Sequence, residues 1–158
     1  MENKKIIVVY YTRTGTTKKV AEAIAEHLKC EIEELVDTKK RKGIFGWLGA
    51  GRDAMREKPT VIKDIKHNPA AYDMVIMGTP NWGSNLVPAV RTYLTQNKEN
   101  LKNVAFFCTT DGSGEKVLKN LEILAGRKPI FSLGVISKEV KKGEYVQKLK
   151  EVLDKIKI

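Results

Sequence analysis

Hydrophobic residues in this chain follow two alternating patterns, which predict strands and helices in turn. Residues 6–10, Ile-Ile-Val-Val-Tyr, form an unbroken apolar run that is rich in β-branched side chains. A strand with both faces buried requires such a run, because none of its side chains points toward water. In residues 16–29, by contrast, Val20, Ile24 and Leu28 recur at helical spacing with charged residues between them. This periodicity predicts an amphipathic helix that covers the sheet.

The alternation continues to the end of the chain and predicts a single α/β domain over residues 1–158. A chain of 158 residues that is 42% hydrophobic can bury one sizeable core. Strands that alternate with helices are typical of a doubly wound parallel sheet with helices on both faces. Further strands are predicted at residues 31–36, 72–79, 103–109 and 130–137, and further helices at residues 88–97, 115–125 and 145–156.

A basic insertion at about residues 38–68 interrupts this rhythm. Connections of such length in compact domains are usually functional or disordered. Nine Lys or Arg residues stand between positions 39 and 66, against three Asp or Glu residues. Within the insertion, Ile44, Leu48, Gly51 and Met55 fall at helical spacing and predict a short helix. The segment around Trp47 could serve as a lid, a docking arm or a dimer contact, and the sequence does not choose among these roles.

The loop at residues 12–17 follows the first strand, at the sheet edge where ligands bind in this class of fold. It contains four threonines, one arginine and one glycine, and it leads directly into a helix. Hydroxyl groups, backbone N–H groups and a helix N-terminus suit a phosphate, and no acidic residue repels one. Helix capping by threonine is the alternative interpretation, but capping does not need four threonines. The predicted phosphate-binding residues are Thr12, Arg13, Thr14, Gly15, Thr16 and Thr17.

A second loop, at residues 78–85, places a tryptophan among turn-forming residues directly after a strand. The indole of Trp82 offers a flat apolar surface, and the flanking Asn81 and Gly83 favour a surface turn over packing in the core. The predicted ligand-binding residues of this loop are Thr79, Pro80, Asn81, Trp82 and Gly83.

A third loop, at residues 108–114, follows the fourth strand and supplies backbone donors. Its predicted ligand-binding residues are Thr109, Thr110, Asp111, Gly112 and Gly114. Cys108 at the strand end is a candidate redox thiol, although a single cysteine that ends a buried strand more often serves only packing.

Residues 8–17, VVYYTRTGTT, followed by Ala21 and Ile24, resemble the N-terminal signature of the flavodoxin family. The resemblance implies a five-stranded sheet in the order 2-1-3-4-5 and one flavin mononucleotide (FMN), whose 5′-phosphate binds the first loop. It also implies that Trp82 stacks on the flavin ring, that the Gly83–Ser84 peptide turns toward N5, and that the third loop contacts the pyrimidine end. The third loop departs from the best-known flavodoxins because it has no tyrosine for the second flavin face. That face is then open, or covered by Trp47 or another subunit.

On this resemblance we expect an FMN-dependent electron transfer protein that shuttles electrons between redox partners and needs no catalytic residue. The net charge of +10 attracts anionic partners, so we expect acidic redox proteins, ferredoxin-like proteins or a reductase. The same charge predicts a flavin reduction potential less negative than is typical of flavodoxins.

Two alternative functions remain. One is an FMN-dependent NAD(P)H:quinone-type oxidoreductase, in which Arg13, Asn81 and Asp111 line a substrate pocket above the uncovered flavin face. The other is a basic module for nucleic acid or a membrane surface, which explains the charge but not the three loops.

Other features argue against several protein classes. Cys30 and Cys108 form no CxxC pair, so neither a disulfide framework nor a metal site is expected. The first apolar run is too short to span a membrane and lacks a cleavage site, so we expect a cytoplasmic protein, monomeric or homodimeric. Residues 112–116, GSGEK, lack the full P-loop spacing. His27 and His67 have no metal-spaced partners, which predicts structural or solvent-facing roles.

Overall fold

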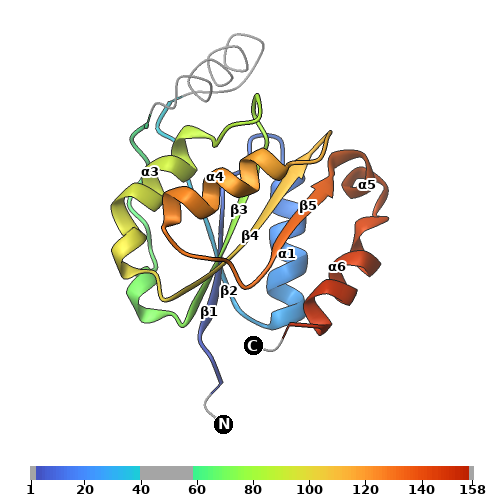
Figure 1. Ribbon diagram of the computed structural model, residues 1–158, viewed down its shortest axis with the longest axis horizontal. Helices are drawn as coiled ribbons and strands as arrows, with labels where there is room; N and C mark the ends of the chain where they lie inside the picture. Colours follow the sequence, from blue (N-terminus) through green and yellow to red (C-terminus); the bar gives the residue numbers. More distant parts are fainter. Residues whose placement is uncertain (1–2, 40–58, 157–158) are drawn as a thin grey trace.

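The computed structural model describes residues 3–39 and 59–156. The strands of this part of the chain form one parallel sheet in the order β2-β1-β3-β4-β5, which confirms the predicted fold class and strand order. All strands point toward the same edge of the sheet, the upper edge in Figure 1. The strands are β1 (Ile6–Tyr10), β2 (Glu31–Glu34), β3 (Met74–Pro80), β4 (Asn103–Thr110) and β5 (Ser132–Ile136).

Helices cover both faces of the sheet, and each face has its own hydrophobic core (Figure 1). Ile7 and Val9 of β1 point into the core under α3 (Pro88–Asn97) and α4 (Glu115–Ala125). Val8 points into the opposite core, under α1 (Thr16–Leu28), α5 (Ser137–Lys142) and α6 (Tyr145–Asp154). Burial on both faces explains why the β1 sequence has no polar residue. None of the described helices is long and apolar enough to cross a membrane.

The structure departs from the predicted elements mainly near the ends of the sheet. Residues 137–142 form α5, for which the sequence pattern gives no signal, because only Val140 of this short helix is buried. Tyr72 does not belong to β3 but ends a 3₁₀ helix (Pro69–Ala71). β2 and β5 are each shorter than predicted. The short helix expected over residues 44–55 lies outside the described residues.

An antiparallel ribbon continues the chain beyond the end of β2. We call residues 35–39 and 60–63 the edge ribbon: Asp37 pairs with Ile62, and the backbone N–H of Lys63 donates to the carbonyl of Val36 at 2.9 Å. Thr92 of α3 anchors the ribbon, because its hydroxyl accepts from the backbone N–H of Thr60 at 2.9 Å and donates to the Thr60 carbonyl at 2.7 Å. These two bonds fasten the ribbon to α3.

Both histidines have structural partners, as predicted. The His27 ring lies 2.9 Å from a carboxylate oxygen of Asp154. His67 donates its backbone N–H to the buried carboxylate of Glu33, and its ring nitrogen Nδ1 lies 3.2 Å from the same group. No group of described residues could hold a metal ion.

Candidate functional site

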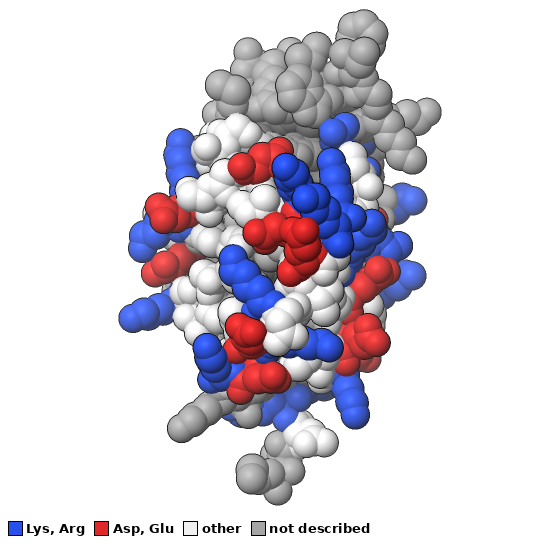
Figure 2. Space-filling view, turned by 90° about the vertical axis from the view of Figure 1, so that its right-hand side faces the viewer, with Lys and Arg blue, Asp and Glu red and all other residues white. Residues whose placement is uncertain are grey.

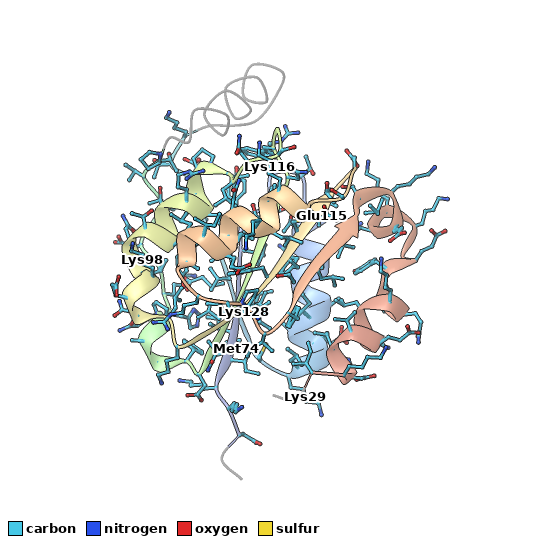
Figure 3. All side chains as sticks on the ribbon, in the orientation of Figure 1. Lys29, Met74, Lys98, Glu115, Lys116 and Lys128 are labelled. Carbon is cyan, nitrogen blue, oxygen red and sulfur yellow. The ribbon has the colours of Figure 1, made fainter. Side chains whose placement is uncertain are left out.

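A pocket of about 180 Å³ lies at the carboxyl edge of the sheet, where the loops after β1, β3, β4 and β5 meet. The N-terminal end of α4, marked by Glu115 and Lys116, lies close to this edge (Figure 3). The structure brings residues of all three predicted loops together here, although they are far apart in sequence. The pocket is lined by Thr12, Arg13, Thr14, Thr16, Thr17, Pro80, Asn81, Trp82, Thr109, Thr110, Asp111 and Ser137.

The first loop presents an uncapped helix N-terminus to the pocket. Gly15 precedes α1 with a φ of 94°, a left-handed conformation that glycine adopts at little cost. No side chain caps α1, and its first turn contains no acidic residue. The N–H groups of that turn and the positive end of the helix dipole are therefore available to an anion. The backbone N–H of Gly15 itself donates to Thr12 Oγ1 at 3.0 Å, which shapes the loop.

A buried hydrogen bond fixes the first loop to β4. The hydroxyl oxygens of Thr17 and Thr109 lie 2.8 Å apart, although 92 positions separate the two residues. Both side chains are almost completely buried. The bond therefore holds the start of α1 in register with the third loop, and it leaves the hydroxyls of Thr14 and Thr16 nearer the solvent.

The second loop is a tight turn that carries Trp82. The backbone N–H of Asn85 donates to the Trp82 carbonyl at 3.0 Å, and Gly83 and Ser84 between them have φ values of 57° and 62°. Two consecutive positive φ values define a type I′ turn. A serine in this conformation is less favourable than a glycine, so the turn holds Ser84 under backbone strain.

Asn81 connects the second loop to the third. Its backbone N–H donates to the Thr109 carbonyl at 2.9 Å, and its side-chain amide donates to Thr110 Oγ1 at 3.0 Å. Trp82 packs edge-to-face against Tyr11, with ring centroids 5.5 Å apart and an angle of 89° between the planes. These contacts set the position of the indole from two sides.

Cys108 and Gly114 pack together beneath the third loop. Cys108 is fully buried, and burial raises the pKa of its thiol to about 11, so the group stays protonated near neutral pH. A Cβ atom on Gly114 would lie 2.5 Å from the Cys108 sulfur. The geometry therefore favours the packing role for Cys108.

The other predicted residues that do not line the pocket have identifiable positions. Thr79 is fully buried, and its hydroxyl donates to the Pro80 carbonyl at 2.9 Å. Gly112 donates its backbone N–H to Thr110 Oγ1 at 3.1 Å, inside the third loop. Gly15, Gly83 and Gly114 shape the backbone around the pocket, all with positive φ.

Sequence reasoning missed Ser137, the first residue of α5, which lines the pocket from the end of β5. The other loops were predicted from the residues that directly follow each apolar strand. Ser137 also directly follows a strand, β5. The prediction assigned Ser137 to the strand itself, and so the hydroxyl was not considered.

The residues around the pocket fit FMN. The uncapped start of α1, the threonine hydroxyls and the guanidinium of Arg13 match a phosphate, and the indole of Trp82 matches a flat ring. Asp111 supplies a hydrogen-bond acceptor away from the phosphate loop. The pocket itself is small, so we expect the flat ring to lie at its open rim.

Comparison with known proteins agrees with this geometry. A family model described as flavodoxin matches residues 5–128, which is most of the chain. A solved flavoprotein from Lactobacillus acidophilus NCFM, in complex with FMN, is similar in structure with 25% sequence identity and a TM-score of 0.74. The similarity covers 88% of this chain and 97% of that chain.

More distant structures share the fold. Two-electron reduced flavodoxin from Megasphaera elsdenii is 18% identical, with a TM-score of 0.57 over 92% of this chain and 96% of that chain. A WrbA-like flavodoxin from Agrobacterium tumefaciens is 17% identical, with a TM-score of 0.56 over 98% of this chain and 99% of that chain. A search of curated proteins finds no significant sequence match.

The Thr17–Thr109 bond predicts a clear double-mutant cycle. Thr17→Val leaves the buried Thr109 hydroxyl without a partner and lowers the free energy of unfolding of the flavin-free protein by about 1–3 kcal/mol. Adding Thr109→Val removes the second hydroxyl and restores most of this loss. Urea unfolding followed by circular dichroism measures both values. Thr14→Val, at an exposed hydroxyl, serves as the control, and additive losses in the double variant would contradict the assigned role.

Proposed function

Because this chain belongs to the flavodoxin family, we propose that it is an electron transfer protein, which holds FMN in the pocket at the carboxyl edge of its sheet. The observation that carries the proposal is the uncapped N-terminus of α1, next to a pocket that is lined by Arg13, several threonines and Trp82. Phosphate and flat ring thus each find a matching surface.

The side chains of the pocket bind and orient the cofactor. The N–H groups at the start of α1 and the hydroxyls of Thr12, Thr14 and Thr16 would hold the phosphate, and Arg13 would offset part of its charge. Trp82, fixed by Tyr11, supports one face of the ring. The electron chemistry belongs to the isoalloxazine ring of FMN, which takes up and gives back one or two electrons. Transfer of this kind needs no acid or base from the protein.

Positive charge near the pocket favours acidic redox proteins as partners. α5 begins at Ser137 in the pocket wall and carries Lys138, Lys141 and Lys142. On the face formed by α1, α5 and α6, Lys and Arg side chains gather in the upper part, toward the carboxyl edge of the sheet, with acidic residues among them (Figure 2). A field of this sign steers a negatively charged partner toward the flavin edge.

The second candidate function is an FMN-dependent NAD(P)H:quinone-type oxidoreductase. The observation that favours it is the third loop, residues 108–114, which has no aromatic side chain to cover the second face of the flavin. An uncovered face leaves room for a nicotinamide or quinone ring to stack on the cofactor.

Substitution of Arg13 separates phosphate recognition from ring recognition. Arg13→Gln weakens FMN binding about tenfold, because a charge-assisted contact with the phosphate is lost. Binding of riboflavin, which has no phosphate, stays the same. Fluorescence titration of the flavin-free protein with each ligand measures both affinities. Lys18→Gln, at an exposed position of α1, is the control, and equal losses for FMN and riboflavin would argue against phosphate binding at this loop.

An anaerobic reduction experiment distinguishes the two candidate functions. We expect the visible spectrum of the FMN-loaded protein to stay unchanged on addition of NADH or NADPH and to bleach on addition of dithionite. This result identifies an electron carrier. Direct bleaching by either nicotinamide cofactor would instead identify a reductase, and failure to retain FMN would contradict both functions.

Electron exchange with an acidic redox protein should depend strongly on salt. Between ionic strengths of about 0.01 M and about 1 M the Debye length falls from about 30 Å to about 3 Å, so we expect the rate to fall at least about tenfold. Stopped-flow absorbance with a ferredoxin measures the rate. Combining Lys138→Glu with Lys141→Glu should reduce the low-salt rate. Lys98→Glu with Lys128→Glu, away from the carboxyl edge (Figure 3), is the matched control. A rate independent of salt would exclude electrostatic docking.

A further inference from the structure

A second and larger pocket lies next to the flavin pocket, between the end of β1 and the edge ribbon. Its volume is about 770 Å³, within the range of pockets that bind small molecules. Thr12 and Arg13 line both pockets. The described residues that line it are Tyr11, Thr12, Arg13, Glu34, Leu35, Val36, Asp37, Thr38, Lys39 and Lys63.

Backbone hydrogen bonds hold the walls of this second pocket in place. The N–H of Leu35 donates to the carbonyl of Tyr10 at 2.7 Å, which joins the edge ribbon to β1. Within the ribbon, the N–H of Thr38 donates to the carbonyl of Val61 at 3.0 Å. The double hydrogen bond between Thr60 and Thr92 fastens the ribbon to α3. These bonds preorganise the walls of the pocket.

Part of the pocket surface is apolar. Tyr11 and Leu35 are buried at 6% and 2% exposure, whereas Val36 remains 39% exposed. Exposed apolar side chains that stand singly are common, but one inside a concave, preformed pocket offers a contact to an apolar ligand group. The edge-to-face contact between Tyr11 and Trp82 separates this surface from the flavin pocket.

The lining carries three cations, Arg13, Lys39 and Lys63, against two carboxylates, and this excess favours an anion. Its two carboxylates already have hydrogen-bond partners: Glu34 accepts from the Tyr10 hydroxyl at 2.9 Å, and Asp37 accepts from the backbone N–H of Lys39 and from Thr60 Oγ1, both at 2.9 Å. The side chains of Arg13 and Lys63, by contrast, form no ion pair or hydrogen bond in the structure as described. These two cations remain available to a negatively charged group.

We propose that the second pocket binds a small aromatic carboxylate, in addition to FMN in the first pocket. The aromatic ring lies against Val36, and the carboxylate lies between Arg13 and Lys63. Each part of this ligand matches a surface that the rest of the protein leaves uncovered. The proposal does not rest on the electron transfer function, because hydrogen bonds within the chain hold the walls of this pocket.

Naphthalene-2-carboxylate is the probe that tests this site. Titration of the full chain, followed by backbone amide chemical shifts, should show saturable binding with one site per chain. Naphthalene-2-carboxamide has the same ring without the charge, and we expect it to bind at least about tenfold more weakly. Equal affinity for the two compounds, or no binding of the carboxylate, would overturn the proposal.

Two variants assign the binding to this pocket. Lys63→Glu should weaken binding of the carboxylate at least about tenfold. Lys98 is an exposed lysine that directly follows α3, and Lys98→Glu should leave this binding unchanged. Val36→Ser should weaken the carboxylate and the carboxamide by the same factor, because it removes only apolar contact. Circular dichroism confirms that each variant is folded. Equal losses in Lys63→Glu and Lys98→Glu would show general attraction to a basic surface and overturn the site.

The FMN-loaded protein provides the decisive comparison. We expect naphthalene-2-carboxylate to bind while the flavin stays bound, with its affinity reduced modestly because the phosphate shares Arg13. One-for-one displacement of FMN, measured from flavin fluorescence, would place the probe in the first pocket and overturn the proposal. If the unmodified protein did not bind FMN, the proposed function would be contradicted. The titration of the flavin-free chain would still test the second pocket.

Discussion

The parallel direction of all strands is the constraint on which the rest of this structure depends. A parallel pair cannot be closed by a tight turn, so each strand must be followed by a crossover that returns the chain to the opposite edge. The helices of these crossovers bury β1 and β3 on both faces, and the loops that lead from β1, β3 and β4 into α1, α3 and α4 lie at the same edge. The two pockets therefore do not result from special local folding. They form because that edge collects the ends of several strands and the start of α1.

Features encoded by neighbouring residues could be predicted from the sequence. The apolar run of β1 and the threonine-rich loop each lie within a few residues, so the sheet order, through the family resemblance, and the location of the first pocket were predictable. Features that depend on distant contacts were not. The Thr17–Thr109 hydrogen bond spans 92 positions, and α5 has too few apolar residues to show a helical period. Gly114 was predicted from the sequence as a ligand contact. In the structure, its lack of a side chain leaves room for the sulfur of Cys108.

The edge ribbon shows the same limit in another form. Leu35 and Val36 belong to a predicted strand, but no strand was predicted for residues 37–39 and 60–63, because backbone bonds and one threonine of α3 hold this part rather than a periodic apolar face. The second pocket is formed by this ribbon, and so sequence reasoning offered no route to it. Arg13, which was predicted from the sequence to bind the phosphate, lines both pockets.

The edge ribbon also has a consequence for how this protein can change over evolution. Thr38 and Val61 are paired by hydrogen bonds from both the backbone and the side chain of Thr38, so the chain leaves the sheet and returns to it at one fixed point. The entropic cost of closing a flexible loop grows slowly with length, by about 0.6 kcal/mol for each doubling. Segments of very different length and composition can therefore be exchanged at this point while the sheet keeps its geometry. The fold thus provides a site where related proteins can acquire new surfaces while the flavin pocket keeps its geometry.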